Sequence, residues 1–214
     1  MRLTELFEPQ VPSRKKSADG TVAEVFIIES LRLADEAKEK HEGAVLAAVL
    51  KMCNKKPLYY YIRTKAELEH LAEKFESSRY RYLHISCHGG DTSLETTLDV
   101  VSYKDFAKIF ENRLAGRRLF VSACSAGNEL FSEIVGSKNG KVISVAAPSE
   151  DIYFDHAVAL WCAFYVKVFS INPTSMNSNR LVEVLKPLAA LFGAPMHFSR
   201  RGDRQKWKHE KVEG

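Results

Sequence analysis

The chain has 214 residues, of which 45% are hydrophobic and 27% charged, enough for one full-sized domain around a hydrophobic core. No apolar run approaches the roughly 18 residues needed to cross a bilayer, and the N-terminus lacks the charge order of a signal peptide, so we expect a cytoplasmic protein without membrane contacts. The net charge of +4 is concentrated in residues 14–16 and 199–214, which leaves the body slightly negative and argues against nucleic-acid binding.

The composition along the chain predicts one domain with an additional segment at each end. Residues 1–20 contain two prolines, a basic cluster and an Asp-Gly pair without sustained periodicity, which is typical of an arm or linker. Residues 21–198 alternate between strand-like and helix-like patterns and form the predicted domain. Residues 199–214 are strongly basic and are predicted to be a mobile tail.

Short apolar or β-branched runs predict strands, and apolar residues at helical spacing predict the helices between them. Because the two alternate from end to end, we expect a three-layer α/β/α sandwich with a mostly parallel sheet and right-handed crossovers. A polar, glycine-led loop with a short hairpin is expected at 89–101. The predicted strands are 24–30, 56–64, 80–88, 117–123 and 141–148, with a further short one at 196–198. The predicted helices are 31–53 with a break near Gly43, 65–75, 103–114, 128–136, 154–169, and 179–192 with a bend or restart at Pro187.

Two residues with catalytic chemistry follow the third and fourth predicted strands. The run YLHISCHGG ends in His88-Gly89-Gly90, and Cys124 follows LFVSA. The carboxyl ends of parallel strands meet at one edge of a sheet, where ligands bind, and neighbouring strands lie about 4.8 Å apart. We therefore expect His88 and Cys124 to face one cleft, with the imidazole activating the thiol as a nucleophile.

Hydrolysis through a thioester also requires hydrogen-bond donors for the developing oxyanion. Gly89 has no side chain, so its backbone N–H can approach a substrate carbonyl closely, and the amide of Cys124 is the second candidate donor. Small residues around the thiol, among them Ser122, leave room for an extended peptide. The pattern predicts a Cys/His peptidase that needs neither a metal nor a cofactor.

The segments HISCHGG and LFVSACSAGN resemble the histidine-glycine and serine-alanine-cysteine boxes of the CHAT proteases, which are bacterial relatives of caspases and separase. The resemblance extends over about residues 22–169. It implies a caspase-like fold, catalytic His88 and Cys124, oxyanion donation by the amides of Gly89 and Cys124, and a role in bacterial defence or cell death. The family has an acidic residue after the cysteine, whereas this chain has Ser125. The family's helical repeats are also missing, so a separate regulatory or activating protein is the expected partner.

Substrate preference and catalytic competence are left open by the sequence. Asp151 and Asp155 follow the fifth strand, and the resemblance implies that acidic groups there favour a basic side chain at P1, the substrate residue before the cleaved bond. Arg32, just after the first strand, would instead favour an acidic one. A caspase-like scaffold that does not cleave, or that acts only in a complex, is the alternative to a peptidase.

Metal and phosphate sites are disfavoured by the same residues. Alternation along the strand turns Cys87 away from His84 and His88, which argues against a zinc site. No lysine-serine pair follows Gly89-Gly90, so phosphate binding is not expected. The four cysteines lie far apart without a CxxC pair and are predicted to be free thiols: Cys53, Cys87, Cys124 and Cys162.

Overall fold

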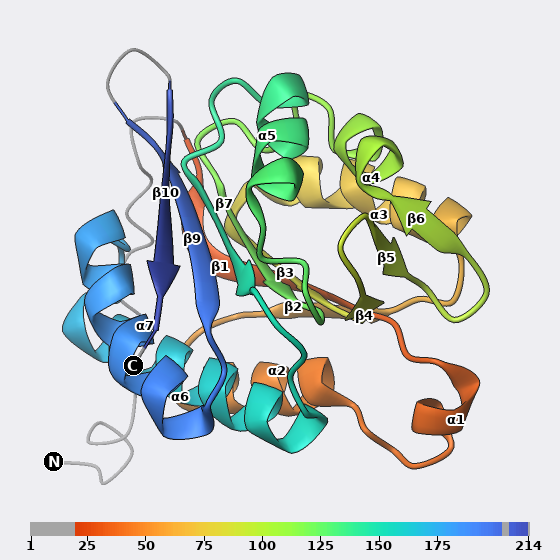
Figure 1. Ribbon diagram of the computed structural model, residues 1–214, viewed down its shortest axis with the longest axis horizontal. Helices are drawn as coiled ribbons and strands as arrows, with labels where there is room; N and C mark the ends of the chain where they lie inside the picture. The colour runs from red at the N-terminus through yellow and green to blue at the C-terminus, as the bar shows by residue number, and fades with distance from the viewer. Residues whose placement is uncertain (1–19, 203–205, 214) are drawn as a thin grey trace, which may run out of the picture.

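A seven-stranded sheet forms the centre of the molecule (Figure 1), in the order β10-β9-β8-β7-β3-β1-β2. The structure is a computed structural model and describes residues 20–202 and 206–213. Five of the strands run parallel, and β9 and β10 add an antiparallel pair at one edge. The strands are β1 (Val22–Glu29), β2 (Leu58–Tyr61), β3 (Tyr80–Ser86), β7 (Arg118–Ser122), β8 (Ser144–Pro148), β9 (Met196–Arg201) and β10 (Trp207–Val212).

Helices cover both faces of this sheet. On one face, α3, α4 and α5 pack against apolar strand residues and form one core cluster; on the other, α2, α6 and α7 form a second cluster with the alternate residues of the same strands. The three-layer α/β/α sandwich with a mostly parallel sheet is therefore confirmed. The helices are α1 (Leu33–Glu36), α2 (Glu42–Met52), α3 (Lys65–Ser78), α4 (Tyr103–Ile109), α5 (Glu129–Lys138), α6 (Phe154–Ile171) and α7 (Ser178–Phe192).

Local sequence signals account for several of these elements. Every residue of β1 and β3 is buried, as expected for parallel strands covered on both faces. A capping box opens α3: the Thr64 hydroxyl accepts from the Glu67 amide, and the Glu67 carboxylate accepts from the Thr64 amide. Pro187 lies inside α7, which runs as one helix without the expected restart.

The glycine-led segment after β3 contains the expected hairpin, which is extended to a small three-stranded antiparallel sheet. It contains β4 (His88–Gly89), β5 (Ser93–Glu95) and β6 (Val100–Ser102), in that order. This small sheet begins at His88 itself, so the hairpin fixes the backbone of the residue expected to act as base.

Two parts of the predicted organisation differ in the structure. The break expected near Gly43 is present but comes earlier: turns at 37–39 separate α1 from α2, which contains Gly43. The predicted mobile tail contains the end of β9 and all of β10, which pair in the sheet. Its basic composition obscured a strand in which Trp207 packs on Gly136; a Cβ at Gly136 would lie 2.4 Å from the indole nitrogen. The predicted arm, 1–20, lies outside the described residues except for Gly20.

Within the described part of the chain, α6 is the helix that is long and apolar enough to cross a membrane by length and composition. Its large side chains, including Trp161, Phe164 and Tyr165, are fully buried against the sheet. Packing in the core of the domain therefore accounts for its apolar composition.

Candidate active site

The sheet brings the ends of β3 and β7 together. The two strands are hydrogen-bonded parallel neighbours whose last paired residues are Ser86 and Ser122, and the Cys87 amide donates to the Ser122 carbonyl at 3.0 Å. His88 and Cys124 each follow their strand's last pair by two residues. The predicted adjacency of these two strand ends is therefore present.

His88 and Cys124 line the same cavity, which has a volume of about 900 Å³. Its walls come from the segment between α1 and α2, the first residues of α2, the ends of β3 and β7, and residues 151–155 ahead of and at the start of α6. A cavity of this size at the carboxyl edge of a parallel sheet has the dimensions and position typical of a ligand site.

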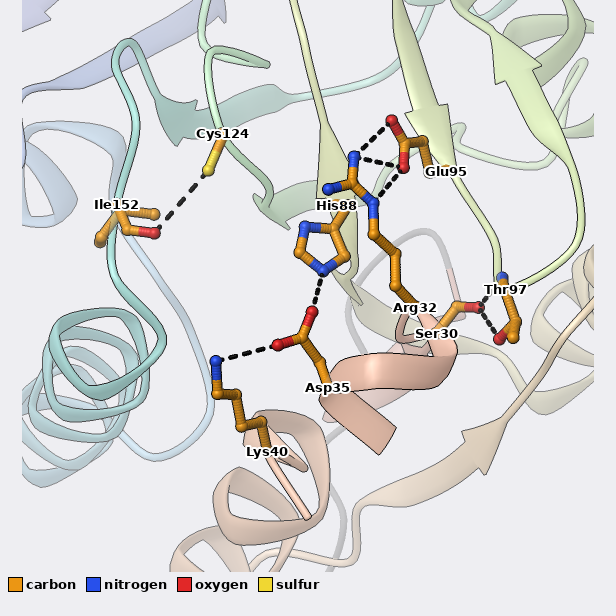
Figure 2. A network of polar contacts seen from close by, with 9 residues as sticks. All are labelled: Ser30, Arg32, Asp35, Lys40, His88, Glu95, Thr97, Cys124 and Ile152. Atoms are coloured by element: carbon orange, nitrogen blue, oxygen red, sulfur yellow. Dashed lines mark hydrogen bonds and ion pairs between the residues drawn. The ribbon is translucent and has the colours of Figure 1, made fainter. Parts of the chain in front are cut away.

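Cys124 is half-buried, and its thiol is directed toward the segment that precedes α6. Its Sγ donates a hydrogen bond to the Ile152 carbonyl at 3.7 Å (Figure 2). Among the described residues, no hydrogen bond joins Cys124 to His88. The thiol and imidazole thus share a cavity without a hydrogen bond between them.

The carboxylate of Asp35 holds the His88 ring in place. The Nε2 atom of His88 lies 2.9 Å from Oδ2 of Asp35, and its ring packs edge-to-face on Phe154 at 5.4 Å (Figure 2). The Lys40 ammonium donates to the other carboxylate oxygen of Asp35 at 2.9 Å. That bond is the main cause that lowers the pKa of Asp35, with His88 adding to it, so Asp35 is ionised at neutral pH.

The Asp35 contact determines which ring nitrogen can act as a base. An ionised carboxylate accepts a hydrogen bond, so the proton of a neutral His88 resides on Nε2 and Nδ1 carries the lone pair. No hydrogen bond between described residues engages Nδ1. Asp35 was not among the site residues predicted from sequence; the available signal was an acidic residue just beyond the carboxyl end of β1, at the same sheet edge as the dyad.

Gly89 packs against the loop that carries the thiol. A Cβ at this position would lie 2.9 Å from the Cβ of Ala123 and 3.2 Å from the Cys124 carbonyl oxygen. Only glycine therefore allows β4 to approach the cysteine loop this closely. Among the described residues, the Cys124 amide makes no backbone hydrogen bond.

The residues predicted to contact substrate fall into two groups. Asp151 and Asp155 both line the cavity. Asp151 accepts a hydrogen bond from the Ser125 hydroxyl at 3.2 Å, and that serine has a left-handed φ of 55°. Ser122 does not line the cavity: its hydroxyl is buried and donates to Glu42 at 3.0 Å. A direct contact between Ser122 and substrate is therefore corrected to an indirect role, holding a cavity residue in place.

Glu42, the first residue of α2, is a buried cavity residue that sequence reasoning missed. Its Oε2 accepts hydrogen bonds from the Ser86 and Ser122 hydroxyls at 3.1 and 3.0 Å. The carboxylate thus connects the ends of β3 and β7 beneath the catalytic candidates. It is visible only once α2 is placed over the sheet.

A second buried carboxylate, Glu29, ends β1 on the same face. It accepts from the Gly43 amide and the Tyr59 hydroxyl, each at 2.7 Å. Burial raises the pKa of Glu29, and the negative charge of Glu42 adds to that effect. Two buried carboxylates, Glu29 and Glu42, therefore lie at the edge of the sheet that borders the cavity.

Side chains alternate along β3 as the sequence predicted. Cys87 packs with the α3 and α4 cluster, and burial raises its pKa to about 12. His84 instead contacts Trp161 and Tyr165 on the opposite face. No group of three or more metal-ligating side chains suited to a metal ion is found in the part of the chain that the structure describes.

Comparison with solved structures finds similarities of fold. No family model matches the sequence, and no curated protein matches it. Caspase-1 from Spodoptera frugiperda is 14% identical, with a TM-score of 0.49 over 79% of this chain and 77% of that one. Oxidised flavodoxin 2 from Bacillus cereus is 17% identical, with a TM-score of 0.38 over 70% and 99%. At this distance, function has to be inferred from the site residues themselves.

Proposed function

We propose that the protein is a cysteine endopeptidase in which Cys124 is the nucleophile and His88 the general base. The observation that carries the proposal is one cavity holding a thiol and an imidazole whose far nitrogen is fixed by Asp35. A nucleophile, a base, and a third group that orients the base are the components of activated nucleophilic catalysis. The resemblance of the HISCHGG and LFVSACSAGN segments to the CHAT proteases supports the same assignment.

The reaction follows from the roles of these groups. The thiol leaves the Ile152 carbonyl and transfers its proton to Nδ1 of His88, while Asp35 stabilises the resulting imidazolium. The thiolate attacks the substrate carbonyl carbon, and the tetrahedral intermediate collapses as the C–N bond breaks and His88 protonates the leaving amine. Water, deprotonated by His88, then hydrolyses the thioester and restores the thiol.

The oxyanion of the tetrahedral intermediate is assigned to the amides of Gly89 and Cys124. The absence of a side chain at Gly89 keeps β4 close to the cysteine loop, and the Cys124 amide is free of backbone partners among the described residues. Two converging backbone donors are the usual arrangement for stabilising this charge.

The resting direction of the thiol favours control by a protein partner. Because Sγ donates to Ile152 rather than to His88, the thiol has to leave this carbonyl before the dyad forms. A regulatory protein that binds the segment ahead of α6 would favour that change. The four free cysteines suit the reducing cytoplasm, and the CHAT resemblance supports a role in bacterial defence or cell death.

The same thiol geometry favours a second candidate, a caspase-like interaction scaffold that does not cleave. In that case the hydrogen bond from Cys124 to Ile152 is simply a structural contact. The two candidates differ in whether His88 changes the reactivity of the thiol.

Two measurements test the peptidase. Coexpression with the products of neighbouring genes is expected to yield a cleaved protein that disappears with Cys124→Ala. In the purified protein, the iodoacetamide reaction of Cys124 is expected to slow roughly tenfold or more with His88→Ala and with Asp35→Asn, because both remove the oriented base.

Asp151→Asn is the matched control, since it neutralises a carboxylate on the same cavity without touching His88. It should leave the alkylation rate close to that of the native protein. Equal reactivity of all four cysteines, unchanged by His88→Ala, would favour the scaffold.

A further inference from the structure

The cavity that contains the thiol has a predominantly acidic wall. Its two lining groups that can carry positive charge, besides His88, already have acidic neighbours: Lys40 bonds to Asp35 at 2.9 Å, and His41 lies 3.5 Å from Glu29. Carboxylates therefore remain in excess and attract a cationic ligand. The acidic lining residues are Asp35, Glu39, Glu42, Asp151 and Asp155.

Within this wall, Glu42 has a carboxylate oxygen without a hydrogen-bond donor. Its side chain is only 4% exposed, and both serine hydroxyls bond to Oε2. Oε1 accepts no hydrogen bond; its neighbour His84 Nε2, which also makes none, lies 3.8 Å away, too far for one. A buried acceptor left unpaired is unfavourable, and a ligand that brings N–H donors relieves it.

Glu42 is also connected to both strand ends that precede the candidate dyad. Its carboxylate is tied to Ser122, two residues before Cys124, and to Ser86, two residues before His88. Glu42 and Cys124 line the same cavity, so a side chain bound at Glu42 and the thiol share one space.

We propose that Glu42 determines the specificity of the site by receiving the guanidinium or ammonium group of an arginine or lysine at P1. The assignment rests on the proposed peptidase function and names its substrate class. Asp151 and Asp155, at the more exposed part of the cavity, add to the negative potential that draws the cation in.

The residue that favoured an acidic P1 is engaged elsewhere. Arg32 donates from Nε and one terminal nitrogen to the two carboxylate oxygens of Glu95, at 2.8 and 2.9 Å. It does not line the cavity, and Figure 2 shows its guanidinium directed toward β5. An acidic P1 side chain in the cavity would thus lie among carboxylates that repel it, because Arg32 is not there to pair with it.

The test uses small mimics of the P1 side chain, so it does not depend on peptide cleavage. Butylguanidine is expected to slow the iodoacetamide reaction of Cys124, whereas butylurea, its neutral counterpart, and butyrate should have little effect. In Glu42→Gln, which retains an oxygen acceptor for both serines, the butylguanidine concentration needed for protection should rise roughly tenfold or more. Glu39→Gln, a change on the same wall, is the matched control and should shift that concentration much less.

A second arm separates this inference from the proposed peptidase. Peptide acyloxymethyl ketones with arginine, leucine or aspartate at P1 are compared for their rate of labelling Cys124. Fastest labelling by the arginine probe, lost in Glu42→Gln, supports the inference; fastest labelling by the leucine or aspartate probe overturns it and leaves the peptidase standing. If no probe labels while butylguanidine protection still depends on Glu42, the peptidase fails and the cation site is supported. Equal protection by butylurea, or protection that survives Glu42→Gln, overturns the inference.

Discussion

The two faces of the central sheet differ most at the carboxyl ends of its strands. On the face covered by α3, α4 and α5, the last inward-pointing residues of β1, β3 and β7 are apolar: Ile28, Ile85 and Val121. The next residue of each strand points to the other face and is polar: Glu29, Ser86 and Ser122. One step along the chain separates a continuous hydrophobic core from the polar floor of the cavity.

This difference shows how one sheet serves both stability and chemistry. Strand side chains alternate between faces, so a polar residue at the end of a strand affects one face only. The buried polar residues are acceptable because they bond to one another, as the Ser86 and Ser122 hydroxyls bond to Glu42. We expect changes on the apolar face to alter stability and changes on the polar face to alter reactivity.

The largest expected effect is on the apolar face. Phe75 of α3 is fully buried and contacts the Phe26 and Phe110 rings at 5.4 and 6.3 Å. Phe75→Ala should lower the free energy of unfolding by about 3–5 kcal/mol, because it leaves a cavity in the core. Urea titration measures the loss. The alkylation rate of Cys124 in the folded variant should change less than about twofold; a change as large as that of His88→Ala would contradict the separation of the two faces.

The second largest effect should be a difference in thiol reactivity between the two faces of the sheet. Burial against the α3 and α4 cluster raises the pKa of Cys87 to about 12, so only about one molecule in ten thousand is ionised there at pH 8. Cys124 lines the open cavity and should react with iodoacetamide roughly a hundredfold faster or more. Peptide mapping after timed alkylation measures both rates. Cys162, whose pKa burial raises to about 11, is the internal reference for a slow thiol.

A smaller loss of stability is expected from removing the polar floor. Glu42→Leu leaves the Ser86 and Ser122 hydroxyls buried without their acceptor and should lower the free energy of unfolding by about 1–3 kcal/mol. Glu42→Gln keeps an acceptor oxygen and should lose less. Urea titration of both variants decides the point: equal losses would mean that the serine hydrogen bonds contribute nothing.

Strand alternation was enough to predict part of this arrangement from sequence. It placed His88 and Cys124 at one sheet edge and turned Cys87 to the other face, because both statements depend only on strand period and parallel order. It did not reveal Asp35 or Glu42, whose contacts depend on the turns that set α2 over the sheet.

The C-terminal strand was missed for a different reason. Lysines on β10 gave the segment the composition of a tail, although Trp207 and Val212 are packed at its two ends. The pairing partner of this strand is β9, itself an addition to the parallel sheet, so no local signal marked where it docks. Composition alone therefore cannot separate a basic edge strand from a basic tail.

The smallest expected effect concerns the pH dependence of the polar face. Burial raises the pKa of Glu29 above its ordinary value of 4.5, opposed by hydrogen bonds from Tyr59 and Gly43 and by the His41 charge, and reinforced by Glu42. Between the ordinary and raised values, the folded chain retains a proton that the unfolded chain releases, so stability falls as pH rises through this window.

Urea titrations at pH 5 and pH 7.5 measure the consequence. The native protein should lose more stability across this interval than Glu29→Gln, which cannot ionise there. Glu36→Gln is the control: the Arg63 hydrogen bond lowers the pKa of Glu36, so that group stays ionised over the whole interval and its removal should leave the difference unchanged. If Glu29→Gln keeps the native difference, Glu29 is not the group that makes the polar face sensitive to pH.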